Sequence, residues 1–553
     1  MTRVVNSRIR LLLLCIVLTF GALLTRAAWI ATVRASSLSQ MAQLQTKTTI
    51  SLPAGRGTIF DTMGTPLALG EQATTVFADP REVRHPVAEA KIAAHLLGVK
   101  AKTLEPLLAD RSKGFVYVDR EIDPALALKL KQRKLSGFMF EPEERRTYPQ
   151  QTVAAPVLGF AGIDNNGLSG LELQMNGALT GQPGQETVVR DPFGRPISIS
   201  GERPVRPGKS VFLTLDHTIE TNAEQVLRAT VGRWGAKHAT AIVLDPKTGA
   251  ILAMAQAPSF DANKSATKGL QQNTAVSDVF EPGSVFKVVT IGAALSEHDV
   301  TPQTKLTLPY SIQVADRRIH DAELRGTETM TVAQILARSS NVGTVTIARK
   351  YLHEDGMKKW MAQFGFGRKT GIDLPGESAG LLPSYWSGST IGNVPIGQGV
   401  SVTALQLASV YGAIANKGLW VQPHLVDHVQ GEKPPAPRTR RILSPKIDRT
   451  LLQMLKGVVS DAGTAQAAEI PGYSVAGKTG TAQVPGPNGY EPGKYVATFV
   501  GMVPASNPRL VVLVSVDEPK NAIFGGVVAA PAFAQIASFD LQYLEVPPDL
   551  KVN

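Results

Sequence analysis

The stretch EPGSVFK, residues 281–287, is followed by VVTIGAAL, residues 288–295, which is apolar on every side. A helix that is apolar all round is a buried helix rather than an amphipathic surface helix. The proline-glycine pair before Ser284 predicts the opening turn, so Ser284 lies at or near the first turn of this helix. Lys287 stands three residues later on the same helical face. The stretch therefore predicts a buried lysine stacked over a serine.

A lysine in such a place indicates chemistry rather than solubility. Burial disfavours the ammonium form, and a neutral amine beside a hydroxyl can take its proton. Lowering a lysine pKa from about 10.4 to about 7–8 costs roughly 3–5 kcal/mol, which suggests a function behind the arrangement. The prediction is a Ser284 nucleophile with Lys287 as its base. The alternative is chance, because Ser-x-x-Lys recurs at Ser265–Lys268, in a polar segment that is predicted to be an exposed loop.

Composition and charge exclude several classes of protein. The 553 residues leave room for a membrane segment and two or more domains. The net charge of +11 comes from scattered basic residues rather than from a stripe with aromatics, so we expect no nucleic acid binding. Such a surface suits anionic lipid or cell-wall polymer. Cys15 is the single cysteine, which excludes intramolecular disulfides and cysteine-rich zinc sites. We expect no metal and no cofactor.

The N-terminus is predicted to be a membrane anchor. Residues 1–10 carry three arginines and no acid, and residues 11–33 are long and apolar enough to span a bilayer, with Arg26 reaching toward an interface. A signal peptide is the alternative, and an uncleaved anchor is favoured. The basic end should stay in the cytoplasm, which places everything after Val33 outside the membrane.

Changes in composition and in predicted secondary structure along the chain indicate its domains. A polar, helix-prone stalk is followed from Pro53 by short β-like runs and turns, with helices near 86–98 and 124–134. The segment RPVRPG at 203–208 is the best boundary. The predicted order is cytoplasmic tail 1–10, transmembrane anchor 11–33, stalk 34–52, β-rich domain 53–207, second domain 208–545 and tail 546–553.

The second domain is predicted to be α+β. Its strands form two hairpins separated by a mostly helical insert, which indicates an antiparallel sheet with flanking helices. The predicted elements are strands at 211–215, 240–245, 250–255, 495–503 and 510–516, and a helix at 217–231.

A second polar group lies inside the insert. Thr331 and Gln334 form a capping box, and the helix that they begin stops at the triplet Ser339-Ser340-Asn341. Polar side chains at a break between apolar helices can point into a cleft, where Ser339 could relay a proton and Asn341 could hold a substrate amide. A plain helix-capping turn is the alternative.

Lys-Thr-Gly occurs three times, at Lys247, Lys369 and Lys478. The first is predicted in a hairpin turn, the second in a loop and the third in a strand between turns. Glycine in a strand permits close approach of another backbone, as when an extended peptide pairs with a sheet edge. Lys478 with the hydroxyls of Thr479 and Thr481 would suit a terminal carboxylate, so we choose Lys478.

The same region contains a misleading pattern. Residues 472–479, GYSVAGKT, fit the phosphate-loop pattern, which needs a strand before it and a helix after it. Pro471 precedes the pattern, and residues 484–489, VPGPNG, cannot begin a helix. A kinase or ATPase is therefore not expected.

Ser-x-x-Lys, Ser-x-Asn and Lys-Thr-Gly in this order resemble the penicillin-binding and serine β-lactamase superfamily. The anchor and the motifs at 56–64, 145–149 and 167–172 resemble the pedestal of class B penicillin-binding proteins. The sequence RAAW at 26–29 and the segment 189–195 are most similar to the septal, FtsI-like branch. The resemblance implies an elongated β-rich pedestal domain of the dimerisation or partner type and a transpeptidase domain.

The resemblance also implies a D,D-transpeptidase that cross-links peptidoglycan stem peptides and is a target of β-lactams. Ser284 would attack the carbonyl between the two terminal D-alanines, and Lys287 would take the hydroxyl proton. Ser339 would pass a proton to the leaving amine, while Lys478 tunes the local charge. The acyl-enzyme would then be captured by an amine from a neighbouring strand.

Substrate binding would use Asn341, Thr479, Gly480 and Thr481. The backbone N–H groups of Ser284 and Thr481 would form the oxyanion hole. The alternatives are a D,D-carboxypeptidase or β-lactamase-like hydrolase, a non-catalytic division scaffold, and the elongation branch of the same family.

By the same resemblance, the expected partners are a SEDS-family glycosyltransferase and other division proteins. The expected location is the inner membrane, with one span, the N-terminus inside and the catalytic domain periplasmic.

Overall fold

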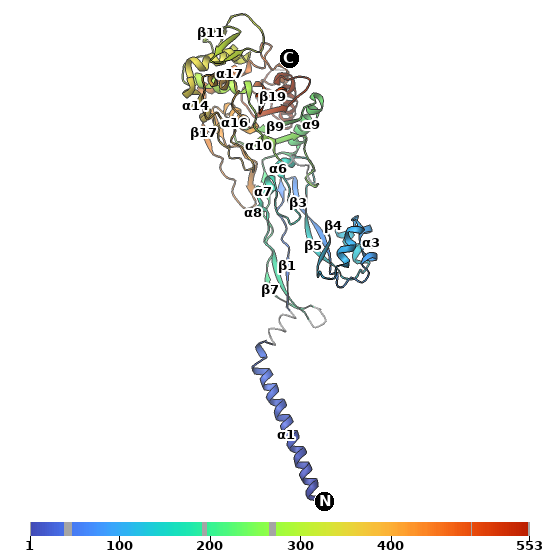
Figure 1. Cartoon of the computed structure of the whole chain (residues 1–553). Coiled ribbons are helices and arrows are strands. Elements are labelled where there is room, and N and C mark those ends of the chain that lie inside the picture. The colour runs from blue at the N-terminus through green and yellow to red at the C-terminus, as the bar shows by residue number, and fades with distance from the viewer. Residues whose placement is uncertain (1, 38–46, 191–195, 265–271, 488, 551–553) are drawn as a thin grey trace. The chain divides into compact units, whose positions relative to one another are not determined.

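The computed structural model describes residues 2–37, 47–190, 196–264, 272–487 and 489–550 (Figure 1). By its internal contacts the chain forms two compact units, Met1–Gly55 with Gly181–Pro207, and Arg56–Thr180 with Gly208–Asn553. Residues 56–180 thus pack with the C-terminal sequence, whereas the sequence predicted a single domain at 53–207. The physical reason lies in strand pairing, described below.

The first unit begins with one long apolar helix, α1 (Thr2–Thr32). Its segment Asn6–Thr32 is apolar and long enough to cross a membrane. The guanidinium carbons of Arg26 and Arg34 lie 5.2 Å and 4.7 Å from the centre of the Trp29 ring. Tryptophan and arginine together at one end of an apolar helix are typical of a membrane interface. The helix is consistent with a single-pass membrane anchor.

The rest of the first unit is a three-stranded antiparallel sheet in the order β1-β6-β7. The strand β1 corrects the prediction of a helix-prone stalk up to residue 50, because its run of Thr48, Thr49 and Ile50 is β-branched and favours a strand. The rest of the stalk, residues 38–46, and part of the FtsI-like segment 189–195 lie outside the described residues. The strands are β1 (Lys47–Leu52), β6 (Gly184–Arg190) and β7 (Pro196–Arg203).

The second unit is built on a five-stranded antiparallel sheet in the order β10-β9-β20-β19-β18. The predicted α+β class is confirmed, and both predicted hairpins form. The edge strand β18 runs on from the phosphate-loop pattern, where that loop would need a helix, so the pattern is a coincidence. The strands are β9 (His238–Leu244), β10 (Ile251–Ala257), β18 (Ala476–Gly486), β19 (Gly489–Val503) and β20 (Leu510–Asp517).

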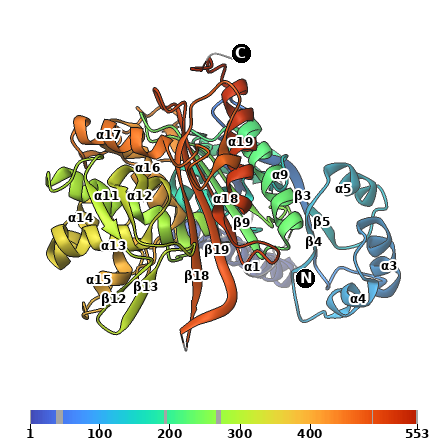
Figure 2. The same ribbon diagram turned by 90° about the horizontal axis from the view of Figure 1, so that it is seen from above.

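Helices cover both faces of this sheet (Figure 2). The helices α9 and α19 pack on one face. On the other face α16 packs against the sheet and α17 contacts the edge strand β18, with α11 on the same side. The strands β9, β10 and β20 are almost wholly buried, as expected where a sheet is covered on both sides. The bounds are α9 (His217–Trp234), α11 (Lys287–Ser296), α16 (Ala404–Ala415), α17 (Pro445–Lys456) and α19 (Ala530–Tyr543).

The insert between the hairpins is mostly helical, as predicted, and also holds short strand pairs that the sequence did not reveal. The strands β11 and β14 pair, as do β12 and β13 and, further along, β15 and β17. The bounds are α12 (Val332–Ala337), α13 (Asn341–Ile347), α14 (His353–Phe364), β11 (Lys305–Leu308), β12 (Ser311–Val314), β13 (Arg317–His320), β14 (Glu328–Thr331), β15 (Leu419–Val421) and β17 (Thr439–Arg441).

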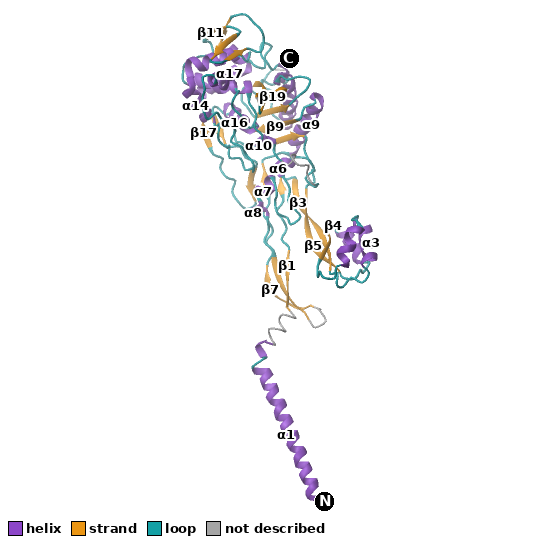
Figure 3. Ribbon diagram, in the orientation of Figure 1, coloured by secondary structure: helices purple, strands orange, loops and turns teal. Residues whose placement is uncertain are grey.

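A second sheet explains why residues 56–180 belong to the second unit. Strand β2 pairs in parallel with β8, which also pairs with β16, so the sheet joins residues far apart in sequence. Beyond β3, the helices α3–α5 enclose a small core of their own, beside β4 and β5 (Figure 3). The bounds are β2 (Ile59–Phe60), β3 (Pro66–Ala78), β4 (Val116–Ile122), β5 (Phe138–Thr147), β8 (Val211–Leu213), β16 (Val426–Val429), α3 (Pro86–Leu97), α4 (Ala101–Ala109) and α5 (Pro124–Lys131).

A buried ionic cluster ties this region together. Glu172 is fully buried and accepts hydrogen bonds from Arg56 Nε at 2.7 Å and Arg146 Nε at 2.6 Å. The hydroxyl of Tyr148 donates to the same carboxylate at 3.3 Å. The motifs at 56–64, 145–149 and 167–172 are therefore structural, and they converge on one carboxylate.

Candidate active site

The predicted opening turn is a single 3₁₀ turn, Gly283–Phe286, which leads directly into α11. Lys287 begins α11 and its backbone N–H donates to the carbonyl of Ser284. The side chain of Lys287 is fully buried, whereas Ser284 is half-buried. The helix is buried along almost its whole length, as its apolar sequence predicted.

The amine of Lys287 reaches across to the triplet that ends α12. Its Nζ donates to the Ser339 carbonyl at 2.5 Å, to Ser339 Oγ at 3.1 Å and to Asn341 Oδ1 at 2.7 Å. In the described part of the chain no hydrogen bond joins the side chains of Ser284 and Lys287, because these three acceptors occupy the amine. The expected contact of Lys287 with Ser284 is thus replaced by contacts of Lys287 with Ser339 and Asn341.

Lys478 approaches the same hydroxyl from the edge strand β18. Its Nζ donates to Ser339 Oγ at 2.9 Å, and its side chain is fully buried. The Ser339 hydroxyl therefore lies between two amines that come from different parts of the sequence. The other two Lys-Thr-Gly lysines, Lys247 and Lys369, are exposed.

Burial makes both lysines weak bases. It lowers the pKa of Lys287 well below its usual value, and the nearby Lys478 lowers it further, while Asp321 acts in the opposite sense. Burial alone lowers the pKa of Lys478 to about 7. A lowered pKa enlarges the fraction of neutral amine, and a neutral amine can accept a proton, which is what a general base requires.

The residues of the triplet Ser339-Ser340-Asn341 have two roles. Ser340 caps a helix, whereas Ser339 and Asn341 contact Lys287. The predicted capping box of Thr331 begins α12. The Ser340 hydroxyl accepts from the N–H of Gly343 and so caps α13, as the capping alternative proposed. Ser339 has a φ of 58°, a left-handed conformation that costs a serine about 1–3 kcal/mol. This conformation accompanies the contact of its side chain with both lysines.

Two glycines allow β18 to lie directly against the nucleophile turn. A Cβ at Gly480 would stand 2.9 Å from the carbonyl oxygen of Pro282, and one at Gly283 would stand 2.9 Å from that of Thr481. Gly283 also has a φ of 55°, which favours glycine. The sequence predicted that Gly480 lets another backbone approach β18 closely. One backbone that does so is the nucleophile turn of the same chain. Since β18 is the edge strand, an extended peptide can still pair with it.

The hydroxyls of the Lys-Thr-Gly-Thr segment are held in place by their neighbours. Thr479 and Thr464 share a hydrogen bond of 2.8 Å between their Oγ1 atoms. Thr481 Oγ1 accepts from the N–H of Gly525 at 3.2 Å. The side chain of Thr481 is half-buried and that of Thr479 is buried.

Asp321, which no sequence motif indicated, positions the triplet. Its carboxylate accepts from the Ser340 hydroxyl at 3.0 Å and from the N–H of Val342 at 2.9 Å, and it forms a salt bridge with Arg325 at 2.6 Å. It also favours the charged form of Lys287. The spacing of an aspartate and an arginine four residues apart is the only signal in the sequence, and it is too common to indicate a site.

Two further groups support the nucleophile turn and were also missed. The buried Glu281 accepts from the N–H of Gly399 at 2.8 Å and from the Tyr490 hydroxyl at 2.9 Å. The buried Tyr411 on α16 donates to the carbonyl of Val285 at 3.0 Å. These bonds link the turn to distant segments, which no local pattern could reveal.

One group of side chains has the geometry of a possible metal centre. In the described parts of the chain, Asp61, Asp216 and His217 place ligand atoms within 4.8 Å of one another. Asp61 already accepts from two backbone N–H groups and contacts His217 Nδ1, while Asp216 caps α9 and accepts from Tyr543. These carboxylates serve the turn and the helix, so they do not indicate a metal.

An antiparallel sheet between helices, with a serine before a buried helix and two buried lysines around a second serine, defines the class of serine acyl-enzymes to which penicillin-binding proteins and serine β-lactamases belong. Residues 239–538 match the family model of the penicillin binding protein transpeptidase domain. Residues 51–213 match that of the penicillin-binding protein dimerisation domain. The chain therefore belongs to the penicillin-binding protein family that combines these two domains.

Individual relatives agree with this assignment. The chain is 34% identical to the probable peptidoglycan D,D-transpeptidase PenA of Neisseria meningitidis, over 98% of this chain and 94% of the relative. It is 32% identical to the peptidoglycan D,D-transpeptidase FtsI of Escherichia coli, over 99% and 93%. The crystal structure of penicillin binding protein 3 from Mycobacterium tuberculosis with aztreonam is similar, with a TM-score of 0.72, 32% identity and coverage of 91% and 99%.

Proposed function

We propose that this protein is a peptidoglycan D,D-transpeptidase, which cross-links stem peptides through a serine acyl-enzyme and releases D-alanine. The observation that carries the proposal is the Ser339 hydroxyl held between Lys478 and Lys287, which stands three residues after Ser284. Relatives named as D,D-transpeptidases support it. The relative that was crystallised with aztreonam supports the further proposal that β-lactams acylate this chain.

The reaction begins when Ser284 Oγ attacks the carbonyl carbon between the two terminal D-alanines of the donor peptide. Lys287 takes the hydroxyl proton in its neutral form, which its lowered pKa provides. Hydrogen bonds that serve catalysis often form only once substrate is bound, and Lys287 needs only to rotate its side chain within the same turn. An ester bond to Ser284 forms as the peptide C–N bond breaks.

The departing D-alanine amine needs a proton. Ser339 lies within hydrogen-bond distance of both lysines, so it can donate its own proton to the amine and regain one from Lys287. An acceptor amine then attacks the ester by the same route in reverse, which forms the new peptide bond and frees Ser284. The net change is exchange of D-alanine for the acceptor amine.

Substrate recognition uses the edge of β18 and the triplet. We propose that Lys478, Thr479 and Thr481 bind the terminal carboxylate and that Asn341 holds the amide of the stem peptide. Gly480 lets the strand lie close to the reacting carbonyl, whose oxygen is stabilised by the backbone N–H groups of Ser284 and Thr481. Removing one such donor typically costs a factor of about 10²–10³ in rate.

Product analysis tests transfer against hydrolysis. Incubating the full chain with a pentapeptide donor and increasing acceptor amine should produce cross-linked product and D-alanine in equal amounts. A transferase favours the amine because the acyl-enzyme partitions toward the bound acceptor rather than water. If D-alanine is released at the same rate without any cross-linked product, the protein is a D,D-carboxypeptidase and this proposal is wrong.

The pH dependence of acylation should report Lys287. The acylation rate should be constant at alkaline pH and fall as pH drops through the pKa of Lys287, because the protonated amine cannot accept a proton. Lys478→Gln removes a positive charge that lowers this pKa, so the acid limb should move to higher pH, whatever the rate at the plateau. Stopped-flow acylation by a chromogenic β-lactam over about pH 5 to 10 measures the limb. If the acid side of the pH profile stays in place or moves to lower pH in Lys478→Gln, the charge of Lys478 does not lower the pKa of Lys287.

We further propose that the chain is held in the inner membrane with its N-terminus in the cytoplasm and residues 34–553 in the periplasm. Residues 1–10 carry three arginines and no acid, which supports this orientation. By resemblance, the anchor and the dimerisation domain would contact a SEDS-family glycosyltransferase and other division proteins during septum formation. Localising a tagged copy in dividing cells distinguishes a septal from an elongation role.

Deleting residues 1–34 tests the anchor. The truncated protein should be soluble, should still bind penicillin and should no longer co-purify with the glycosyltransferase, because the apolar helix is removed while the site is kept. Co-purification from detergent extracts, with the full chain as control, measures the loss. If the truncated protein keeps its partner, the anchor is not the contact.

A further inference from the structure

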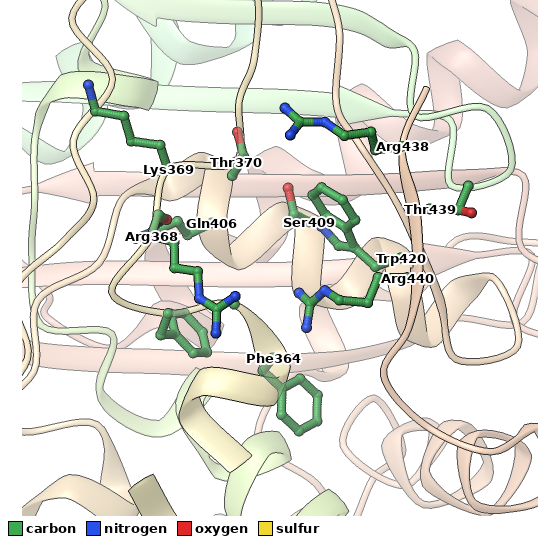
Figure 4. Close-up of a pocket in the computed structure, with 12 residues that line it drawn as sticks. Phe364, Arg368, Lys369, Thr370, Gln406, Ser409, Trp420, Arg438, Thr439 and Arg440 are labelled. Carbon is green, nitrogen blue, oxygen red and sulfur yellow. Dashed lines mark hydrogen bonds between the residues drawn. The ribbon is translucent and has the colours of Figure 1, made fainter. Parts of the chain in front are cut away.

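A cavity of about 280 Å³ lies between α14, α16, β15 and β17 (Figure 4). It is lined by none of the residues assigned to catalysis or substrate binding. One wall is formed by Phe364, Phe366 and Trp420. The Phe366 ring also packs against Phe286 of the nucleophile turn, at 5.1 Å between ring centres. The mechanism makes no use of this cavity.

The cavity is strongly cationic. Arg368, Lys369, Arg438 and Arg440 line it, and none of them forms a salt bridge with a described carboxylate. Figure 4 shows the guanidinium groups of Arg368 and Arg440 turned toward the same space. Burial, together with the charge of Arg368, lowers the pKa of Arg440. Two like charges facing one space repel each other unless an anion lies between them.

A buried hydroxyl gives an independent indication of a ligand. Ser409 on α16 is 4% exposed, and its Oγ has no hydrogen-bond partner in the described part of the chain. Buried hydroxyls normally find a partner, because leaving one unsatisfied is costly. Ser409 lines the cavity, so a ligand there can supply the missing partner.

We propose that this cavity binds a small phosphomonoester that carries a ring. Arginine forks fit phosphate oxygens in pairs, and the facing guanidinium groups of Arg368 and Arg440 suit a doubly charged group. The Ser409 hydroxyl can donate to a phosphate oxygen. A ring can stack beside Trp420, over which Arg440 already lies at 5.6 Å. The volume approaches the lower end of small-molecule sites.

Phenyl phosphate, inorganic phosphate and phenol are the probes for a binding experiment on the full chain in non-ionic detergent. Calorimetry should show one phenyl phosphate bound per chain, inorganic phosphate bound more weakly and phenol not bound, because charge and ring both contribute. Quenching of tryptophan fluorescence, lost in Trp420→Leu, should locate the binding. Phenol that binds as well as phenyl phosphate, or no binding of phenyl phosphate, would overturn the proposal.

Two variants test the named contacts. Arg368→Gln removes a charge whose side chain makes no hydrogen bond within the described residues, and it should weaken phenyl phosphate binding about tenfold. Lys91→Gln, on the exposed face of α3, makes the same change of net charge and should bind as wild type does. Ser409→Ala keeps every charge and should weaken binding without lowering the unfolding temperature. If Arg368→Gln and Lys91→Gln weaken binding equally, or if Arg368→Gln and Ser409→Ala both bind as wild type does, the site is wrong.

Discussion

Ser284→Ala should abolish covalent labelling of the protein by a fluorescent penicillin. Ser284 is the half-buried hydroxyl in the 3₁₀ turn before α11, and the proposed acyl bond can form only on its Oγ. Removing the nucleophile of a serine enzyme lowers the rate by about 10⁶. Labelling of the full chain in detergent, followed by gel fluorescence over hours, measures the loss.

The second Ser-x-x-Lys copy provides a matched control. Ser265→Ala makes the same substitution in the same pattern, at a position outside the described residues, and should label at the wild-type rate. Equal unfolding temperatures of the two variants would show that both are folded. Labelling that persists in Ser284→Ala, or that disappears in Ser265→Ala, would show that another residue carries the acyl group.

Glu172→Gln should lower the free energy of unfolding by about 3–5 kcal/mol, the cost of breaking a buried ion pair from one side. Glu172 is fully buried and is the shared acceptor of Arg56, Arg146 and Tyr148. An amide there leaves two buried guanidinium groups without a compensating charge. Urea unfolding, followed by intrinsic fluorescence, measures the change.

An exposed ion pair in the same region provides the control. Glu71 and Arg145 are joined at 2.9 Å with both side chains 43% exposed. Water already screens this pair, so Glu71→Gln should cost less than about 1 kcal/mol. Equal losses in Glu71→Gln and Glu172→Gln would mean that burial does not decide the strength of these pairs.

The local elements could be predicted because short-range physics decides them. The apolar run after Ser284 made α11 buried, and the capping box at Thr331 began α12 where expected. Alternating turns and β-branched runs located the strands of both hairpins. The choice of Lys478 rested on its strand context, and Lys478 is the fully buried one of the three candidate lysines.

The sequence alone therefore determined the α+β class, the apolar N-terminal helix and the three motifs. Only the tertiary structure decided that Lys287 contacts Ser339 and Asn341 rather than Ser284, and that Asp321 holds the triplet. Only it joined residues 56–180 to the C-terminal part, through the pairing of β2 with β8. Periodicity and capping act over a few residues, whereas side-chain contacts and strand pairs between distant segments depend on how the whole chain closes on its core.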